Sequence, residues 1–222
     1  MPNIDVKLIR SARARQITLR VSSLDGKVSV TAPKHVSTPK IEKFLYQQES
    51  WVKWKRSEVP KKLDVTIGSI IPYRGQMVKL VKYAGKNILR SDDKLLIPES
   101  KKCVGLITKE FLKQAARKHI EYEAINYSKK IGKSYTKLSL RDTRSRWGSC
   151  NGKKALMFSW RLVMAPPEVL SYVAAHEVAH LKHMNHSVQF WEEVMRLYGH
   201  HYKARQWLRE KGMSLHRYSF YH

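Results

Sequence analysis

Apolar and polar residues alternate along much of the first hundred positions, and a period of two predicts β-strands. Residues 4–10 and 15–21 alternate in this way. Asp25 and Gly26 then indicate a turn into a third strand over residues 28–32. The chain therefore begins with a stranded part.

A change of period after Ser37 predicts a helix. Ser37 and Thr38 offer capping hydroxyls, and Pro39 suits the first helical turn. Apolar residues then recur at roughly helical spacing, which predicts one helix from Thr38 to about Arg56. Proline and glycine punctuate the next stretch, where we expect further strands at residues 78–81, 88–89 and 95–97.

A helical period dominates from Thr108 onward. It predicts a long amphipathic helix that ends at Gly132. Two strands are expected at residues 135–141 and 156–163, with a turn at Gly148 and Ser149 before the second. Helical signals fill the chain from Pro167 to its end.

These patterns predict an α+β protein with a boundary near residue 100. Residues 1–100 form a mainly β N-terminal part with one helix, and residues 101–222 form a helix-rich part. At 222 residues the chain is one large domain or two small ones, and either can bury a real core.

Charge is the strongest bulk property. The chain carries 43 Lys and Arg against 18 Asp and Glu, a formal net charge of +25. Residues 1–100 have 20 basic and 9 acidic side chains and residues 101–222 have 23 and 9, so the excess is spread along the chain. This indicates a nucleic acid, a nucleotide or an acidic surface as a partner, or merely a basic soluble surface.

Several classes of protein are excluded by composition. Hydrophobic residues make up 42% of the chain, too many for a disordered protein. No stretch approaches the roughly 18 apolar residues of a membrane-spanning helix, and residues 1–5 do not read as a secretory signal. Cys103 and Cys150 are too few for a disulfide framework, so a reducing cytoplasm is the expected compartment.

The motif that carries chemistry lies at residues 176–180, which read His-Glu-Val-Ala-His. His176 and His180 are one helical turn apart, so both imidazoles leave the same flank of a helix, as two zinc ligands would. Glu177 points to the neighbouring sector. From there it can take a proton from a water whose pKa a metal has lowered to about 7.

His186 supplies a third candidate ligand. On an unbroken helix it would lie about 15 Å along the axis from His176, too far to share a metal. We therefore expect the helix to end between His183 and Asn185, with Asn185 as terminator. Ser187 is then a plausible N-cap for a following helix.

Other assignments remain open. Glu192 or Glu193 could replace His186 as the third ligand, and Cys150 could join the site. His183, His200 and His201 are each interpreted as ordinary surface or core residues.

Longer segments carry a family resemblance. They are the N-terminal run at 14–21, the pairs at 44–45 and 51–52, Arg-Trp-Gly-Ser-Cys at 146–150, Tyr-Val at 172–173, His-Glu-Val-Ala-His-Leu at 176–181, Asn-His-Ser at 185–187, and Phe-Trp at 190–191. Over nearly its full length the chain resembles the YgjP-like metallopeptidases, zincin-type metal-dependent hydrolases akin to the SprT-like and WLM-type proteases. The resemblance implies a zincin-like fold in which His176, His180 and His186 hold the metal and Glu177 is the catalytic base.

The resulting hypothesis is a hydrolase with one zinc per chain, or another divalent transition metal, acting on a peptide or protein. In zincin-like folds an edge strand above the active helix can pair with extended substrate. Arg144, Arg146 and Trp147 could line that cleft, although Trp147 could equally pack in the core. One alternative is hydrolysis of a nucleotide phosphoanhydride, and another is a nucleic-acid-binding module whose metal is structural.

Overall fold

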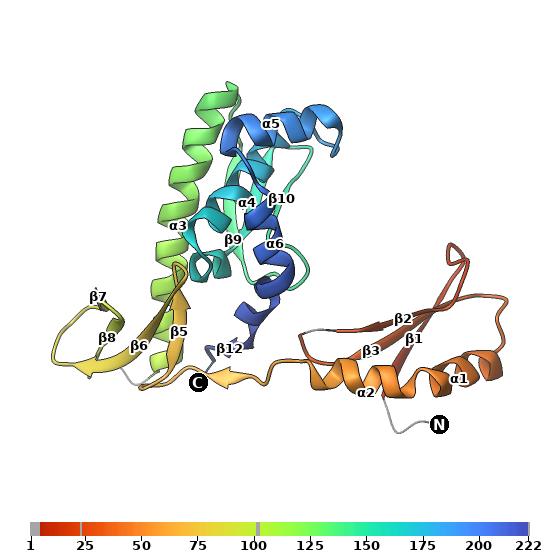
Figure 1. Cartoon of the computed structure of the whole chain (residues 1–222). Coiled ribbons are helices and arrows are strands. Elements are labelled where there is room, and N and C mark those ends of the chain that lie inside the picture. The colour runs from red at the N-terminus through yellow and green to blue at the C-terminus, as the bar shows by residue number, and fades with distance from the viewer. Residues whose placement is uncertain (1–4, 23, 101–102, 222) are drawn as a thin grey trace. The chain divides into compact units, whose positions relative to one another are not determined.

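The computed structural model describes residues 5–22, 24–100 and 103–221, so Ile4 of the first predicted strand and residues 1–4 lie outside the described residues. The chain forms two compact units, Met1–Lys61 and Lys62–His222, each built from helices and small sheets (Figure 1). This confirms the α+β prediction. No helix in the described part of the chain has the length and apolar character needed to cross a membrane.

The first unit is a three-stranded sheet with two helices. Strand β3 (Val28–Pro33) lies in the middle of the sheet, parallel to β1 (Val6–Ser11) and antiparallel to β2 (Thr18–Val21). Its alternating apolar side chains are buried against α1 (Thr38–Gln47), and α2 (Glu49–Ser57) follows. The three strands predicted for this part are therefore present, with bounds that differ by a few residues.

The single helix predicted from Thr38 to about Arg56 is wrong, because the helix is interrupted at Gln48. The Gln48 N–H bonds both the Phe44 and the Leu45 carbonyls at 3.1 Å, a tightened last turn. Gln48 itself has φ −97° and ψ 6°, and α2 begins directly after it. Helical spacing of apolar residues continues across such a break, so the pattern does not reveal it.

The second unit begins with a four-stranded sheet in the order β5 (Ile70–Tyr73), β6 (Gln76–Tyr83), β8 (Lys94–Pro98), β7 (Leu89–Ser91). Its buried residues share one core with the helices that follow, through Val78 and Leu95 on the sheet and Leu112 on α3. The strand β4 (Leu63–Asp64) pairs with β12 (Tyr218–Ser219), near the end of the chain. The compact units thus divide near residue 61, and the predicted boundary near residue 100 lies inside the second unit.

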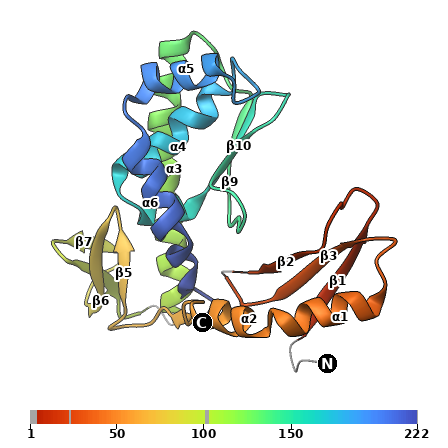
Figure 2. The same ribbon diagram turned by 45° about the vertical axis from the view of Figure 1, so that its right-hand side comes forward.

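Helix α3 (Val104–Ile131) is the longest element and ends at Gly132 in the left-handed conformation with φ 63°, as predicted. Helix α4 (Pro167–Ala179) packs between α3 and a small sheet (Figure 2). The helices α5 (Val188–Tyr198) and α6 (Tyr202–Lys211) also contact α4, and a 3₁₀ helix, η2 (Gly212–Arg217), leads to β12. This arrangement buries α4 on most sides.

The small sheet has β11 (Ala155–Ser159) in the middle, parallel to β9 (Lys137–Arg141) and antiparallel to β10 (Gly148–Cys150). Two predictions are wrong here. Gly148 and Ser149 lie in β10 rather than in a turn, because the reversal is made one step later, where the Asn151 side chain accepts the N–H groups of Lys153 and Ala155.

The strand predicted at 156–163 also stops early. Ser159 is paired with Arg141, the last residue of β9, and the chain continues as the buried 3₁₀ helix η1 (Trp160–Met164). Arg161 turns its guanidinium inward to Asp142 and to the Leu215 and Tyr218 carbonyls. The alternation of apolar and polar residues predicts an exposed side chain for this arginine and cannot predict that it is buried.

Candidate metal centre

Helix α4 positions the first two predicted ligands. Pro167 stands in its first turn, and Val173, Ala174 and Val178 are buried along its length. His176 lies in the third turn of α4 and His180 directly follows its last residue, so the two side chains leave the helix on one flank. Their ring centroids are 5.0 Å apart.

The helix ends earlier than predicted. Its last regular residue is Ala179, and the Leu181, Lys182 and His183 N–H groups close short turns onto Val178 and Ala179. Asn185 does not adopt a left-handed conformation, since the described non-glycine residues with positive φ are Arg74, Asp92 and Lys154. Tight turns rather than an asparagine terminator therefore bring the chain back.

His186 nevertheless returns to the other two histidines. Its ring centroid lies 5.1 Å from that of His176 and 4.8 Å from that of His180. Ser187 caps α5 as predicted, with its hydroxyl accepting the Phe190 N–H at 3.4 Å. The Phe190 ring packs against all three imidazoles and forms an apolar floor beneath them.

The three histidines fit a single metal ion. One nitrogen from each lies within 4.8 Å of the others, and the His176 Nε2 and His186 Nε2 atoms are 3.2 Å apart. Two ligands of a tetrahedral zinc at about 2.05 Å would be about 3.3 Å apart. His180 Nδ1 donates to the His183 carbonyl at 2.9 Å, which leaves Nε2 with a free lone pair.

The protonation of the cluster favours metal binding. Burial, together with the neighbouring His180 and His186, lowers the pKa of His176 to about 3. Burial also lowers the pKa of His180. These two imidazoles are therefore neutral at neutral pH, the form that a metal requires.

Glu177 is the buried carboxyl group beside this cluster, with 5% of its surface exposed. Burial raises its pKa to about 8, whereas the Arg146 charge and a hydrogen bond from the Cys150 backbone N–H act in the opposite direction. A metal cation held by the three histidines would oppose this effect of burial and favour the carboxylate, the form that accepts a proton.

Strand β10 runs directly over Glu177 and forms one edge of its sheet. A Cβ placed on Gly148 would lie 2.5 Å from the Glu177 Cγ and Oε1 atoms. The backbone groups of Trp147 and Asn151 form hydrogen bonds with β11. In an antiparallel pair, residues alternate between bonding to the partner strand and pointing away from it. The backbone groups of Gly148 and Cys150 therefore point toward the free edge of the sheet.

The three residues predicted to contact substrate lie in two different places in the structure. Arg144 and Arg146 are exposed and line a hollow of about 560 Å³ beside β10. Trp147 instead packs its ring against His216, with centroids 5.4 Å apart, and against Gly212. The packing interpretation of Trp147 accounts for its position, and substrate contact by the two arginines stays a prediction.

The alternative ligands do not join the cluster. Among the described residues, the group of potential ligands at this place consists of His176, His180 and His186. The Glu193 carboxylate is buried and accepts hydrogen bonds from Lys182 and Arg196. Burial raises the pKa of Cys150 to about 11, which keeps its thiol protonated.

An aromatic stack beside the histidines was not predicted. The His201 ring lies between Tyr172 and Trp191, at centroid distances of 5.8 and 5.1 Å. Arg205 lies over Trp191 at 4.9 Å. The position of Tyr172 beside the site could be predicted from the sequence, since it precedes His176 by one helical turn. The packing of α6 against α4 cannot be predicted from nearby residues.

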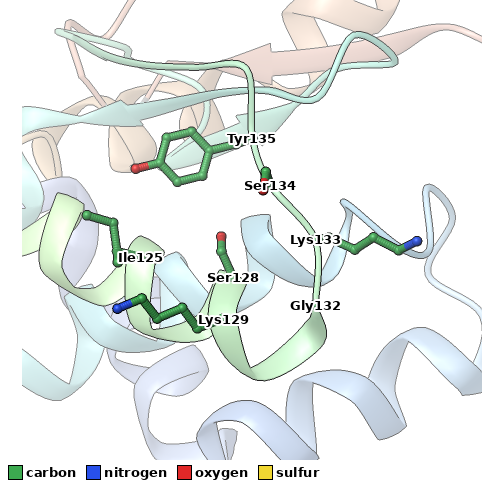
Figure 3. Close-up of a pocket in the computed structure, with 7 residues that line it drawn as sticks. All are labelled: Ile125, Ser128, Lys129, Gly132, Lys133, Ser134 and Tyr135. Atoms are coloured by element: carbon green, nitrogen blue, oxygen red, sulfur yellow. The ribbon is translucent and has the colours of Figure 1, made fainter.

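A second hollow, of about 380 Å³, lies at the end of α3 (Figure 3). The Ser128 hydroxyl points toward the Tyr135 ring, and Lys129 and Lys133 extend to opposite sides. None of the predicted site residues lines it.

The histidine cluster could hold a metal ion, as the site of a metal-dependent hydrolase must. A family model described as "YgjP-like, metallopeptidase domain" matches residues 15–211, and the chain therefore belongs to the YgjP-like family. This confirms the resemblance drawn from the sequence. No curated protein matches the chain.

Proposed function

We propose that the protein is a zinc-dependent peptidase whose metal is held by His176, His180 and His186. The observation that carries the proposal is the 3.2 Å separation of two imidazole nitrogens next to a buried glutamate. A catalytic zinc site uses three protein ligands, whereas a structural site closes with four. Three histidines without a fourth protein ligand among the described residues favour the catalytic kind.

Each residue then has a stated role. A bound zinc would polarise the scissile carbonyl and acidify a water molecule. Glu177 accepts the proton of the attacking water on its carboxylate and later delivers it to the leaving amine. The Cys150 N–H orients that carboxylate, and the free edge of β10 offers backbone groups to an extended peptide.

Hydrolysis of a nucleotide phosphoanhydride is the second candidate. The basic hollow beside β10 favours it, because Lys and Arg side chains can hold phosphates. A nucleic-acid-binding module with a structural metal is a weaker third candidate, supported by the net charge of +25 alone.

A substrate screen separates these candidates. The metal-loaded protein is offered peptides, proteins with and without DNA, and nucleoside triphosphates, with Glu177→Gln as the blank. We expect peptide cleavage that the blank lacks. Release of pyrophosphate or phosphate without peptide cleavage would select the second candidate, and no turnover of any substrate would reject both enzymatic ones.

A reducing compartment such as the cytoplasm is part of the proposal. Both cysteines, Cys103 and Cys150, are free thiols, and Cys103 is exposed. Free exposed thiols are usual where the thiol pool is kept reduced.

A further inference from the structure

The outer face of the small sheet carries a basic hollow of about 560 Å³. Lys137 and Arg141 of β9 line it together with Arg144, Arg146 and, on β10, Ser149. Hydroxyl groups, one amide and the apolar residues 155–157 of β11 complete the lining, and within the described part of the chain no acidic side chain lines it. The hollow therefore concentrates positive charge on the sheet whose edge strand β10 contacts Glu177.

Among the described residues, none of these four cations forms an ion pair or a side-chain hydrogen bond, although the Arg146 charge acts on Glu177. The acid nearest in sequence, Asp142, is turned away and binds Arg161, with contacts of 2.7 and 3.2 Å. Four unpaired like charges repel one another, and an anion bound among them relieves that repulsion.

Strand β10 connects the hollow to Glu177. Successive residues of a strand face opposite sides of the sheet. Gly148 and Cys150 approach Glu177, whereas Ser149, between them, lines the hollow. A peptide that pairs with the free edge of β10 must alternate in the same way. Side chains on the face of Ser149 then point toward the β10 side of the hollow, where Arg144 and Arg146 precede the strand, whereas β9 with Arg141 forms the opposite edge of the sheet. Their neighbours face Glu177.

We propose that the hollow binds Asp and Glu side chains of an extended peptide paired with β10, so that the protein selects acidic segments as substrates. This rests on the peptidase function proposed above. Guanidinium groups bind carboxylates with two parallel hydrogen bonds, and Arg144 and Arg146, on the segment that leads into β10, can each do so. An amide or a basic side chain in the same place leaves the cations uncompensated.

Binding is measured on the metal-loaded Glu177→Gln variant, so that turnover does not intervene. A labelled peptide with Asp and Glu at alternate positions is compared with its Asn and Gln twin at low salt. We expect the acidic peptide to bind at least about 10-fold more tightly, with a ratio that shrinks as salt rises.

Two double variants show where the preference comes from. Arg144→Gln/Arg146→Gln is expected to bring the ratio below about 3-fold. Lys129→Gln/Lys133→Gln removes the same charge beside the hollow at the end of α3 and should leave the ratio unchanged. Equal effects of the two double variants would show a general charge effect and overturn the proposal.

Three further outcomes are decisive. Tighter binding of a single-stranded oligonucleotide of equal charge, lost in Arg144→Gln/Arg146→Gln, would assign the hollow to nucleic acid instead. Cleavage by the wild-type chain is measured separately. Equal cleavage of both peptides overturns the acidic preference alone. Hollow-dependent binding of the acidic peptide with no cleavage of any peptide overturns the peptidase function and leaves the binding preference standing.

Discussion

Gly148 lies against Glu177 so closely that a methyl group on it would fall 2.5 Å from the Glu177 Cγ and Oε1 atoms. Its φ is not in the left-handed region, so the glycine is required by the close approach rather than by the backbone conformation. The edge strand and the buried carboxyl group are thereby held in contact, and the Cys150 N–H completes the arrangement.

Gly148→Ala is expected to displace the Glu177 carboxylate without removing a metal ligand. Bound metal should stay near one per chain, stability should fall by about 1–3 kcal/mol from overpacking, and turnover should fall about 10- to 100-fold. Elemental analysis, urea unfolding and peptide cleavage measure the three effects. The matched control is Gly152→Ala, whose Cβ meets nothing within 4 Å. Equal effects of both substitutions would contradict the claim that the close contact of Gly148 with Glu177 matters for activity.

The candidate site was largely predictable because it is local. His176, Glu177 and His180 lie within two helical turns, so helical geometry alone relates them. His186 followed from the argument that a shared metal requires the helix to end. Where the helix ends was predicted wrongly, since the tight turns onto Val178 and Ala179 depend on the packing of α4.

The parts that could not be predicted depend on distant segments. The break at Gln48, the role of Gly148 as a strand residue and the inward turn of Arg161 all require knowledge of the neighbouring element. The charge pattern predicted an anionic partner but gave no location. The structure gathers Lys137, Arg141, Arg144 and Arg146 in one hollow.

Asp142 and Arg161 form a partly buried ion pair whose loss should be costly. The Arg161 side chain is 5% exposed and that of Asp142 is 29% exposed. Asp142→Asn is expected to lower stability by about 2 kcal/mol, less than for a fully buried pair because Asp142 reaches solvent. Urea unfolding of the single and double variants with Arg161→Met should give a coupling of about 1 kcal/mol or more.

The exposed pair of Lys113 and Glu110 is the matched control for that cycle. Its side chains are 39% and 56% exposed, so its coupling should stay below about 0.5 kcal/mol. A coupling between Asp142 and Arg161 that is no larger than this would contradict the structural role of their ion pair.

His216 should make stability fall in mild acid. Burial, with smaller contributions from the Arg161 and Arg144 charges, lowers its pKa to about 4, although Asp142 acts in the opposite direction. The unfolded chain therefore binds a proton on this residue below its ordinary pKa of 6.5, while the folded chain does not. The resulting stability is present above pH 6.5 and is lost as pH falls toward 4.

The variant His216→Phe tests this in melting curves between pH 4 and 7. Its ring can keep the contact with Trp147, and its melting temperature should depend less on pH than that of the wild type. Parallel pH dependences of the two proteins would show that His216 titrates normally.

Removal of His186 should weaken metal binding without unfolding the chain. His186 is exposed, so His186→Ala is expected to change stability of the metal-free protein by less than about 1 kcal/mol. Zinc content after dialysis against a weak chelator should fall well below one per chain. His200→Ala, an exposed histidine outside the cluster, should retain the metal. Full retention in both variants would remove His186 from the site.

The most direct test of a catalytic metal centre is the comparison of metal content and turnover in Glu177→Gln. Glutamine keeps the size of the side chain and one acceptor oxygen for the Cys150 N–H, but it cannot take up a proton at neutral pH. The variant should keep its zinc and its melting temperature, while cleavage of a verified substrate falls by about two to four orders of magnitude. Unchanged turnover, or loss of the metal together with activity, would contradict the role of Glu177 as the proton acceptor.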